Sequence, residues 1–396
     1  MRVSMAKISN VEVFLLGKEV AAATWASLMV LTKVTTSDGV VGWGETVAAL
    51  RADAMKAMVR KVGKVYVGKD PFDVEGNRRE WYKHDFNLSI SLESTSALSA
   101  LDIASWDVIG KYLGAPVHSL IGGSTRDRVK VYANGWYGNC VTPEEFAEKA
   151  KEVKAKGYKA LKFDPFGPHF DSITETGLRI AEERVRVVRE VMGEEGEILI
   201  EHHGRFNYQA AIKIAKALEK YNPLFMEEPV HPEDLEALRK YRRRTKLKVA
   251  LGERIITKQA ALQFLKEGLV DFLQIDLYRI GGITEARKVT AMAEAFGVEM
   301  AYHNAQGPIL NAATLQLDAA IPNFLIQESF YDFFPEWKKE IIGHGTPVED
   351  GHALVPKGPG IGVEVKEEMI EGLLVKGEEY FNPSEPVWVV KGTWRD

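Results

Sequence analysis

Residues 198–253 read ILIEHHGRFNYQAAIKIAKALEKYNPLFMEEPVHPEDLEALRKYRRRTKLKVALGE, and this stretch decides the fold. Three short apolar runs end at or just before a glutamate, and helical periodicity fills the intervals between them. A short strand, an amphipathic helix and a further short strand form the pattern of parallel β/α units. The expected strands are Ile198–Glu201, Leu224–Glu227 and Val249–Leu251, and the expected helices are Asn207–Lys220 and Pro232–Arg243.

The same alternation continues on both sides of this stretch. Seven or eight consecutive units are too regular for an open sheet whose strand order reverses, so a closed barrel is favoured. We therefore predict an α/β fold with a modified (β/α)7β barrel of the TIM type over residues 126–360. Its further strands are expected at Val129–Ala133, Ala160–Phe163, Phe272–Ile275, Glu299–Tyr302 and near Leu325–Gln327, and its further helices at Pro143–Lys156, Glu175–Val191, Lys258–Glu267 and Ile283–Ala295.

Residues 1–125 have a different organisation. Strand patterns at Ile8–Leu16 and Ser27–Thr36 precede the turn signal Ser37-Asp38-Gly39, and a helical period begins at Ala52. Strands followed by helices predict a separate α+β domain. Residues 361–396 end in a stretch rich in Pro and Trp, and we expect this segment to pack back on the first domain.

The composition argues against several classes of protein. Hydrophobic residues at 45% and charged residues at 27% match neither a disordered chain nor a membrane protein. A net charge of −5 provides no basic surface for nucleic acid. Cys140 is the only cysteine, which rules out an internal disulfide and a thiolate metal site. The first residues lack the apolar core of a signal peptide, so we expect a cytoplasmic protein.

Acidic residues recur at the ends of three neighbouring strands. Glu201, Glu227 and Glu253 follow one another at equal spacing, once per β/α unit. Three converging carboxylates repel one another unless a hard metal relieves the repulsion. Mg²⁺ takes oxygen ligands and leaves positions for water and a substrate carboxylate. The pattern predicts a Mg²⁺ site, although any one of these glutamates alone would more often cap a helix or pair with an arginine.

A candidate general base follows two later strands. Asp276 and His303 each stand at a strand end, and a carboxylate on one strand can orient a histidine on the next and raise its basicity. By itself His303 would more often be an ordinary core or surface histidine. Together the two residues predict an acid–base pair at the same end of the barrel.

Polar side chains on the other side of the predicted barrel can face the same cavity. Lys162 and Asp164 alternate along one strand, so both can point to the interior. His203 lies two residues after Glu201. Because His202 and His203 are adjacent and point opposite ways, we expect only one of them to be functional.

Four motifs occur in a fixed order between Ala100 and Gly282. They are the helix Ala100–Asp107, Met226-Glu227-Glu228-Pro229, Gly252-Glu253-Arg254, and Asp276 followed by Arg279-Ile280-Gly281-Gly282. Together they resemble the mandelate racemase subgroup of the enolase superfamily. The resemblance implies a cap domain over a modified barrel, one Mg²⁺, and abstraction of the proton α to a carboxylate.

The resemblance also implies ligands for the metal. Glu201, Glu227 and Glu253 match the Mg²⁺ ligands, with Glu201 standing where the family more often has Asp. Glu228 matches a residue that supports these ligands.

Acid–base roles follow in the same way. His303 with Asp276 matches the base, and Glu328 matches the acid that hydrogen-bonds the enediolate oxygen. The run Glu201-His202-His203-Gly204-Arg205 resembles that of galactonate dehydratases, in which the residue matching His203 protonates the departing hydroxyl. Lys162 completes the expected catalytic set.

One departure from the racemase pattern bears on the reaction. Racemases of the subgroup carry Lys-x-Lys on the second barrel strand, whereas this chain has Lys162-Phe163-Asp164. Loss of the second lysine removes a base from the opposite face and favours loss of water over racemisation. The resemblance therefore implies a dehydratase that acts on a sugar acid such as D-xylonate, D-gluconate or D-galactonate. Whether the acid has five or six carbons stays open.

Residues expected to contact the sugar acid lie in both domains, and each also has an ordinary packing or turn role as an alternative. They are Asp164, Trp25, His84, Asn87, Tyr137 and Arg205. A racemase or epimerase of a 2-hydroxy acid, or a sugar-acid-binding relative without activity, are the alternatives for function. The superfamily favours symmetric homo-oligomers, from dimers to octamers. Sparse Cys, Asn and Gln with abundant Glu, Lys and Arg are typical of thermophiles.

Overall fold

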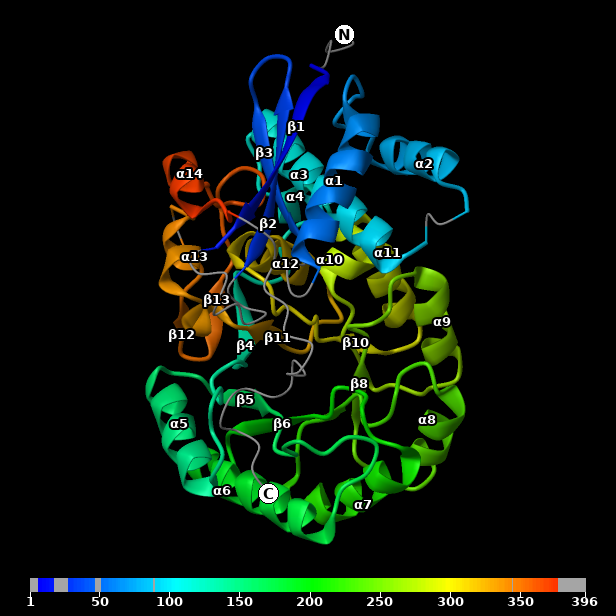
Figure 1. Ribbon diagram of the computed structural model, residues 1–396, viewed down its shortest axis with the longest axis vertical. Coiled ribbons are helices and arrows are strands. Elements are labelled where there is room, and N and C mark those ends of the chain that lie inside the picture. Colours follow the sequence, from blue (N-terminus) through cyan, green and yellow to red (C-terminus); the bar gives the residue numbers. More distant parts are fainter. Residues whose placement is uncertain (1–5, 18–27, 47–50, 88–89, 344, 377–396) are drawn as a thin grey trace.

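The computed structural model describes residues 6–17, 28–46, 51–87, 90–343 and 345–376, which form a small domain seated on a larger barrel (Figure 1). The small domain, here called the cap, opens with three antiparallel strands in the order β1-β2-β3. Helices follow and cover one face of this sheet. The strands are β1 (Ile8–Leu16), β2 (Met29–Thr36) and β3 (Val41–Thr46), and the helices are α1 (Ala52–Tyr66), α2 (Val74–His84) and α3 (Leu92–Leu113).

Helix α3 is the centre of the cap. Ser91 caps its first turn by accepting a hydrogen bond from Ser94 N, and Gly114 ends it in the left-handed conformation that glycine adopts at low cost. Most of its residues are buried, because β3 packs on one face and the barrel on another. A β-carbon at Gly44 would overlap the Ala100 carbonyl oxygen, so glycine lets β3 lie directly on α3.

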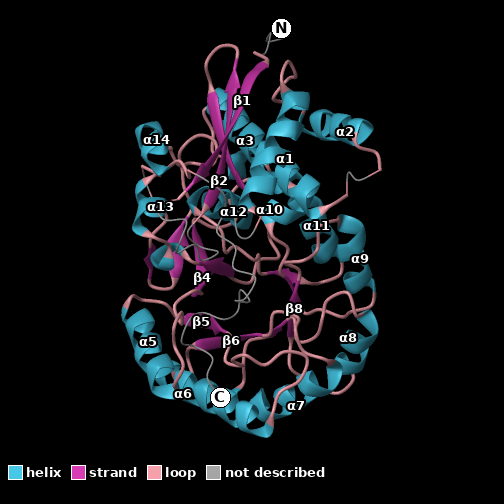
Figure 2. Ribbon diagram, viewed as in Figure 1, coloured by secondary structure: helices cyan, strands magenta, loops and turns pink. Residues whose placement is uncertain are grey.

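The barrel is built from eight parallel strands among the described residues, and helices surround it (Figure 2). Strands β4 to β10 pair in sequence order, and β11 pairs with β4. A parallel bridge between Met300 and Phe324 joins β10 to the segment before β11, which closes the ring. The strands are β4 (Arg128–Ala133), β5 (Ala160–Phe163), β6 (Glu197–Glu201), β7 (Met226–Glu227), β8 (Val249–Leu251), β9 (Phe272–Leu273), β10 (Glu299–Met300) and β11 (Gln327–Ser329).

Amphipathic helices connect consecutive strands and cover the outside of the barrel (Figure 2). They are α5 (Pro143–Ala155), α6 (Glu175–Met192), α7 (Tyr208–Leu218), α8 (Leu235–Arg242), α9 (Lys258–Lys266), α10 (Leu277–Ile280) with α11 (Gly282–Ala295), and α12 (Pro308–Ala320). Shorter elements are α4 (Val117–Leu120), α13 (Glu336–Glu340), α14 (Ile370–Leu373), and a hairpin of β12 (Val348–Glu349) and β13 (His352–Leu354) that pairs with β4.

The inside of the barrel is packed rather than hollow. One buried side chain from each strand or its immediate neighbour forms a separate apolar cluster: Tyr132, Ala160, Leu199, Phe225, Ala250, Phe272, Ala301 and Ile326. This layer closes the barrel below the strand ends, so polar chemistry is confined to the carboxyl-terminal rim.

The (β/α)7β barrel with an α+β cap predicted from the sequence is confirmed. Strand bounds agree within one or two residues in most cases, and β1, β5 and β8 agree fully. The first part of the terminal segment contacts the cap, because Gly17 N donates to Leu373 O and Val375 N donates to Leu15 O. Residues 377–396 lie outside the described residues. None of the described helices is both long and apolar enough to cross a membrane.

Replacement of Gly44 by alanine tests the packing of β3 on α3. The added methyl group meets the backbone of α3, and overpacking of this kind costs about 1–3 kcal/mol. We expect Gly44→Ala to lower the urea midpoint accordingly. Gly372→Ala is the control, since no atom lies within 4 Å of its added β-carbon and it is expected to leave stability unchanged or slightly raised. Equal midpoints for the two variants would contradict this packing.

Candidate active site

Adjacent strand ends bring the three predicted acidic residues to one rim. Glu201 and Glu227 are direct partners in the β6–β7 register, and Glu253 stands two residues beyond β8. Their exposed fractions are 2%, 0% and 7%. The predicted carboxylate cluster is therefore present, and it is almost completely removed from water.

The ammonium group of Lys162 lies between carboxylates of this cluster. Its Nζ is 2.6 Å from Glu227 Oε2, 2.8 Å from Glu328 Oε1 and 3.1 Å from Glu201 Oε2. Lys162 comes from β5, and its side chain is 1% exposed. A buried cation of this kind persists only when its charge is balanced, and here the carboxylates balance it.

The carboxylates are not equally compensated. Burial and the neighbouring charge of Glu201 raise the pKa of Glu227 well above its ordinary value, and Lys162 only partly opposes this. Burial would also raise the pKa of Glu201, but His203 and Lys162 outweigh it and hold that pKa low. The negative charge of the cluster is therefore not fully balanced by Lys162. One carboxylate oxygen of the cluster, Glu227 Oε1, is buried and also has no hydrogen-bond partner among the described residues.

An all-oxygen donor set with an unsatisfied buried oxygen fits a hard cation such as Mg²⁺. In the part of the chain that the structure describes, no group of three or more His, Cys, Asp or Glu side chains is already arranged as a metal site. Lys162 stands between Glu201 and Glu227, and Glu253 is paired with cationic side chains. The oxygen atoms of these side chains are suitable ligands for a hard metal ion, and in this structure they contact the charged groups of lysine, arginine and histidine side chains.

His303 is held between two carboxylates. Its Nδ1 is 2.5 Å from Asp276 Oδ2, and its Nε2 is 2.9 Å from Glu253 Oε2. Burial would lower the pKa of His303, but the charges of Glu328 and Glu253 and the bond to Asp276 raise it well above its ordinary value. Asp276 also accepts a hydrogen bond from Tyr278 N at 2.9 Å, which fixes its carboxylate as the cap of α10.

A second histidine–carboxylate pair lies across the barrel. His203 Nδ1 is 2.9 Å from Asp164 Oδ2. Arg205 binds the same carboxylate through two nitrogens, at 2.6 and 3.0 Å. Burial would raise the pKa of Asp164, but Arg205 and His203 outweigh it and hold that pKa well below its ordinary value. Asp164 is therefore an anion that orients His203.

The adjacent histidines have different surroundings. His202 is fully buried against Phe166, and its Nδ1 contacts the Glu227 carbonyl oxygen at 3.1 Å. Burial lowers the pKa of His202 to about 4. His203 is partly exposed and has a φ of 54°, a left-handed backbone conformation that is uncommon outside glycine. Backbone strain of this kind is frequent at functional sites.

Amides complete the network around the carboxylates. Glu328 accepts hydrogen bonds from Asn134 Nδ2 and from Asn304 N, both at 2.7 Å. Gln274 Nε2 donates to Glu227 Oε2 at 2.7 Å. Gln274 and Asn304 are not among the site residues predicted from the sequence, although Gln274 lies two residues before Asp276 and Asn304 directly follows His303. That position is the signal that could have identified them.

The predicted substrate contacts fall into three groups. Asp164 directly follows β5 at the rim and is bound there by Arg205, and Tyr137 follows β4 at the same end of the barrel. His84 and Asn87 are exposed on the cap, where His84 faces Glu80 of its own helix at 3.9 Å. Trp25 lies outside the described residues.

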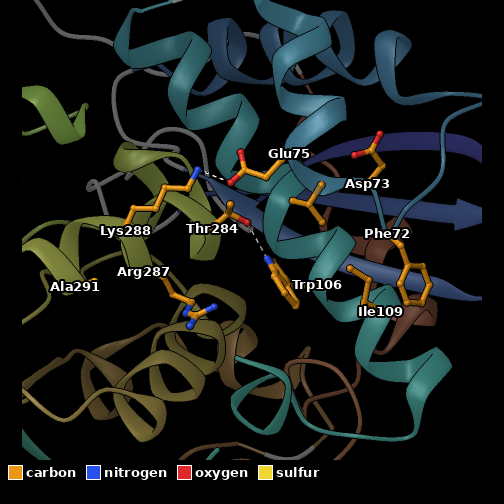
Figure 3. Close-up of a pocket in the computed structure, with 10 residues that line it drawn as sticks. Phe72, Asp73, Glu75, Trp106, Ile109, Thr284, Arg287, Lys288 and Ala291 are labelled. Atoms are coloured by element: carbon orange, nitrogen blue, oxygen red, sulfur yellow. Dashed lines mark hydrogen bonds and ion pairs between the residues drawn. The ribbon is translucent and has the colours of Figure 1, made fainter. Parts of the chain in front are cut away.

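A crevice of about 580 Å³ lies between the cap and α11, apart from the carboxylate cluster (Figure 3). None of the predicted site residues lines it, and Glu75 and Lys288 form an ion pair across it. The crevice therefore marks the seam between the two domains rather than the site of chemistry.

Two family models match the chain. The enolase C-terminal domain-like model matches residues 145–369, and the N-terminal domain model of mandelate racemase and muconate lactonizing enzyme matches residues 17–122. The chain belongs to the mandelate racemase/muconate lactonizing enzyme family of the enolase superfamily. The resemblance seen in the sequence is thereby confirmed.

Similar members of this family include named dehydratases. A D-gluconate dehydratase of Thermoproteus tenax is 52% identical over 391 residues, which cover 99% of this chain and 79% of that protein. A D-gluconate/D-galactonate dehydratase of Picrophilus torridus is 44% identical over 99% of this chain and 100% of that protein. Among solved structures, a mandelate racemase/muconate lactonizing enzyme from Sulfitobacter sp. superposes with a TM-score of 0.87 at 32% identity, covering 94% of this chain and 96% of that one.

The Arg205–Asp164 pair can be tested against an exposed pair of the same type. Arg239 binds Glu267 through two nitrogens, with about a third of each side chain exposed. Removing one partner of a buried pair costs about 3–5 kcal/mol, because the other charge is left uncompensated. An exposed pair contributes about 0–1 kcal/mol. We expect Arg205→Met to lower the free energy of unfolding in urea far more than Arg239→Met, and equal losses would refute this assignment.

Proposed function

We propose that this protein dehydrates a sugar acid, an aldonate, to the corresponding 2-keto-3-deoxy acid. The observation that carries the proposal is the pair of histidine–carboxylate dyads on opposite sides of one carboxylate-lined rim. Asp276 and His303 lie just after strands β9 and β10 and form one dyad. Asp164 and His203 lie just after strands β5 and β6 and form the other. Loss of water needs one group that removes a proton and another that protonates the departing hydroxyl. The named dehydratases among the relatives support the same reaction.

His303 is the base that removes the proton from the carbon next to the substrate carboxylate. Its Nδ1 is paired with Asp276 and its Nε2 with Glu253 Oε2, so proton uptake at Nε2 requires the Glu253 carboxylate to move away from this nitrogen. Asp276 fixes the ring orientation and stabilises the imidazolium that forms. Glu328 Oε2 lies 3.7 Å from the same Nε2, and Glu328 would have to carry a proton to hydrogen-bond the substrate oxygen on which negative charge develops.

His203 gives a proton to the hydroxyl group on the next carbon. The C–O bond breaks and water leaves, and the resulting enol then tautomerises to the 2-keto acid. Asp164 binds the ring at Nδ1 and is itself held by Arg205, and we assign the proton transfer to Nε2. Lys162 balances the carboxylates and keeps them in place between the two dyads.

Glu201, Glu227 and Glu253 are the residues that would hold Mg²⁺. When bound, the ion would neutralise these carboxylates and stabilise negative charge on the substrate carboxylate. The support for it is chemical: an all-oxygen donor set, the unused Glu227 Oε1, and membership of a superfamily whose dehydratases generally depend on Mg²⁺.

D-Gluconate and D-galactonate are the first substrates to test, because the similar relatives carry those names. D-Xylonate is the five-carbon alternative. The substrate contacts at Asp164, Arg205, Tyr137, Trp25, His84 and Asn87 all stay predictions from the sequence. A homo-oligomer and a cytoplasmic location also stay predictions.

The competing isomerase reading requires a second base opposite His303. The described side chains on that face are committed elsewhere: Lys162 bridges three carboxylates and Asp164 binds Arg205. Among the described residues, His203 with Asp164 is the one histidine–carboxylate pair on that face. We assign to His203 the protonation of a leaving group.

Separate substitution of the two histidines distinguishes the readings. His303→Asn is expected to abolish both dehydration and exchange of the α-proton in deuterated water, because the base is lost. His203→Asn is expected to reduce dehydration of D-gluconate at least 100-fold while α-proton exchange continues, since a general acid contributes about 10²–10⁴-fold. Both readouts come from one incubation followed by NMR and a 2-keto-3-deoxy acid assay. Full dehydration by His203→Asn would refute the assignment of the acid.

Removal of Mg²⁺ tests the ligand set by a readout besides activity. A ligand that binds only the folded state at 100 times its Kd adds about 2.7 kcal/mol of stability. We expect the melting temperature to rise with Mg²⁺, to fall with chelator, and to lose this dependence in Glu227→Gln. Dehydration should follow the same pattern. A melting temperature that responds equally to Mg²⁺ in the wild type and in Glu227→Gln would contradict the proposed ligand.

A further inference from the structure

The barrel helices differ in how their first turns are capped. Five of them are capped by the side chain of their own N-cap residue, which accepts a hydrogen bond from a backbone N–H of the first turn: Thr142, Thr174, Asn207, Asp234 and Thr257 for α5 to α9. Helices α11 and α12 begin instead after glycines, Gly281 and Gly307, which have no side chain to supply a cap. The free N–H groups of these two helices need partners from elsewhere.

The cap domain supplies the partner of α12. Glu45, at the end of β3, accepts hydrogen bonds from Ile309 N and Leu310 N, both at 3.1 Å. A β-carbon at Gly307 would overlap the Glu45 carboxylate, so glycine opens the path to the helix end. Lys338 donates to Gln306 O at 3.3 Å and opposes the effect of burial, which raises the pKa of Glu45 to about 7.

The cap domain also supplies the partner of α11. Asp102, in the middle of α3, accepts a hydrogen bond from Thr284 N at 3.1 Å. Gly282 makes room for it, because a β-carbon there would overlap the Asp102 carboxylate. Trp106, one turn further along α3, donates to Thr284 Oγ1 at 2.9 Å, and Figure 3 shows this bond at the seam between the domains.

Two further cap residues hold the backbone just before α11. Arg78 Nη1 donates to Gly281 O at 2.8 Å, and Ser99 Oγ accepts from Gly281 N at 3.0 Å. Gly281 is also the residue at which α10 ends. The junction between α10 and α11 is therefore bound by cap side chains at Gly281 and at Thr284.

These two helices are the ones that follow the dyad of the base. Asp276 caps α10, which leads directly into α11. His303 is followed by Asn304, whose Nδ2 donates to Asn311 Oδ1 in the first turns of α12 at 2.7 Å. A shift at the start of either helix is thus transmitted to one member of the dyad through a short, hydrogen-bonded path.

We propose that Glu45 and Asp102 are positioning residues for the His303–Asp276 dyad, acting as helix caps that the cap domain lends to α12 and α11. The proposal rests on the proposed dehydratase function for its kinetic readout. It assigns the cap domain a part in catalysis that is separate from substrate recognition. Neither carboxylate contacts the substrate in this role.

The test compares loss of a cap with its conservative replacement. Glu45→Ala and Asp102→Ala remove the acceptors, whereas Glu45→Gln and Asp102→Asn keep an oxygen that can accept from the same N–H groups. Gly307→Ala displaces Glu45 from the helix without changing it, at a φ of −148° that alanine adopts freely. Thr142→Ala is the matched control, because it removes a cap from α5, a barrel helix that does not follow the dyad.

With a saturating aldonate well below the melting temperature, both alanine variants and Gly307→Ala are expected to lose between about tenfold and 100-fold in kcat, since small misplacements of catalytic groups have effects of that size. KM should stay within about twofold, because no substrate contact is removed. Glu45→Gln and Asp102→Asn should recover most of the loss. Thr142→Ala should lose stability but keep the wild-type kcat.

A second readout does not depend on turnover. The short His303–Asp276 hydrogen bond is expected to give a strongly downfield proton resonance, assigned by its disappearance in His303→Asn. This resonance should shift or vanish in the three disrupting variants and persist in the conservative ones and in Thr142→Ala. If the wild type dehydrates no aldonate, the proposed function fails while this readout still decides the present proposal. Wild-type kcat and an unchanged resonance in Asp102→Ala and Gly307→Ala would overturn it.

Discussion

The ammonium group of Lys162 is buried against the carboxylates of Glu201, Glu227 and Glu328. Without a positive charge at this place, several acids would meet in a medium of low polarity and would have to take up protons. Burial already raises the pKa of Glu227, which shows that one lysine does not fully balance the cluster. The rest of the rim depends on this balance, because each further buried carboxylate at a strand end stays ionised only if a cation lies beside it.

The same requirement orders the two dyads. On one side Arg205 binds Asp164 and leaves it an anion, so His203 is oriented by a fixed negative charge. On the other side His303 itself answers the charges of Asp276 and Glu253. In both arrangements Nδ1 of the histidine is bound by an aspartate, and the proposed proton transfers are assigned to Nε2. An enzyme that removes a proton on one face and delivers one on the other needs this division between its histidines.

The positions of the strands and of most site residues could be predicted because their signals are local. A short apolar run that ends in a polar residue is visible within six residues, and the end of a barrel strand is where chemistry is expected. Helix α10 is too short to show a period, and the sequence prediction missed it. The contacts of Lys162 with three carboxylates could not be predicted either, since the alternation on β5 shows only that its side chain faces inward. Which carboxylates it meets depends on how three other strands close the ring.

The carboxylates of the cap were beyond prediction for a different reason. Asp102 accepts its hydrogen bond from a residue 182 positions away, and Glu45 from residues 264 and 265 positions away. In the sequence, Asp102 is one of several polar residues in its helix, which also contains Ser99, Ser105 and Asp107, and the glycines at 281, 282 and 307 are typical of turns. Their common purpose becomes visible only when the two domains are docked.

A helix whose first turn is capped by a residue of another domain differs in one respect from a helix capped by its own N-cap residue. A helix such as α9 is complete as soon as its own loop folds, because Thr257 satisfies its first turn. The first N–H groups of α11 and α12 are buried when α3 and β3 pack against them, and a buried N–H without a partner costs about 1–3 kcal/mol. Glu45 and Asp102 supply those partners at the moment of docking. Docking of the cap and ordering of the segments around Asp276 and His303 are thus one cooperative event. On this proposal, the position of the base depends on a docked cap domain.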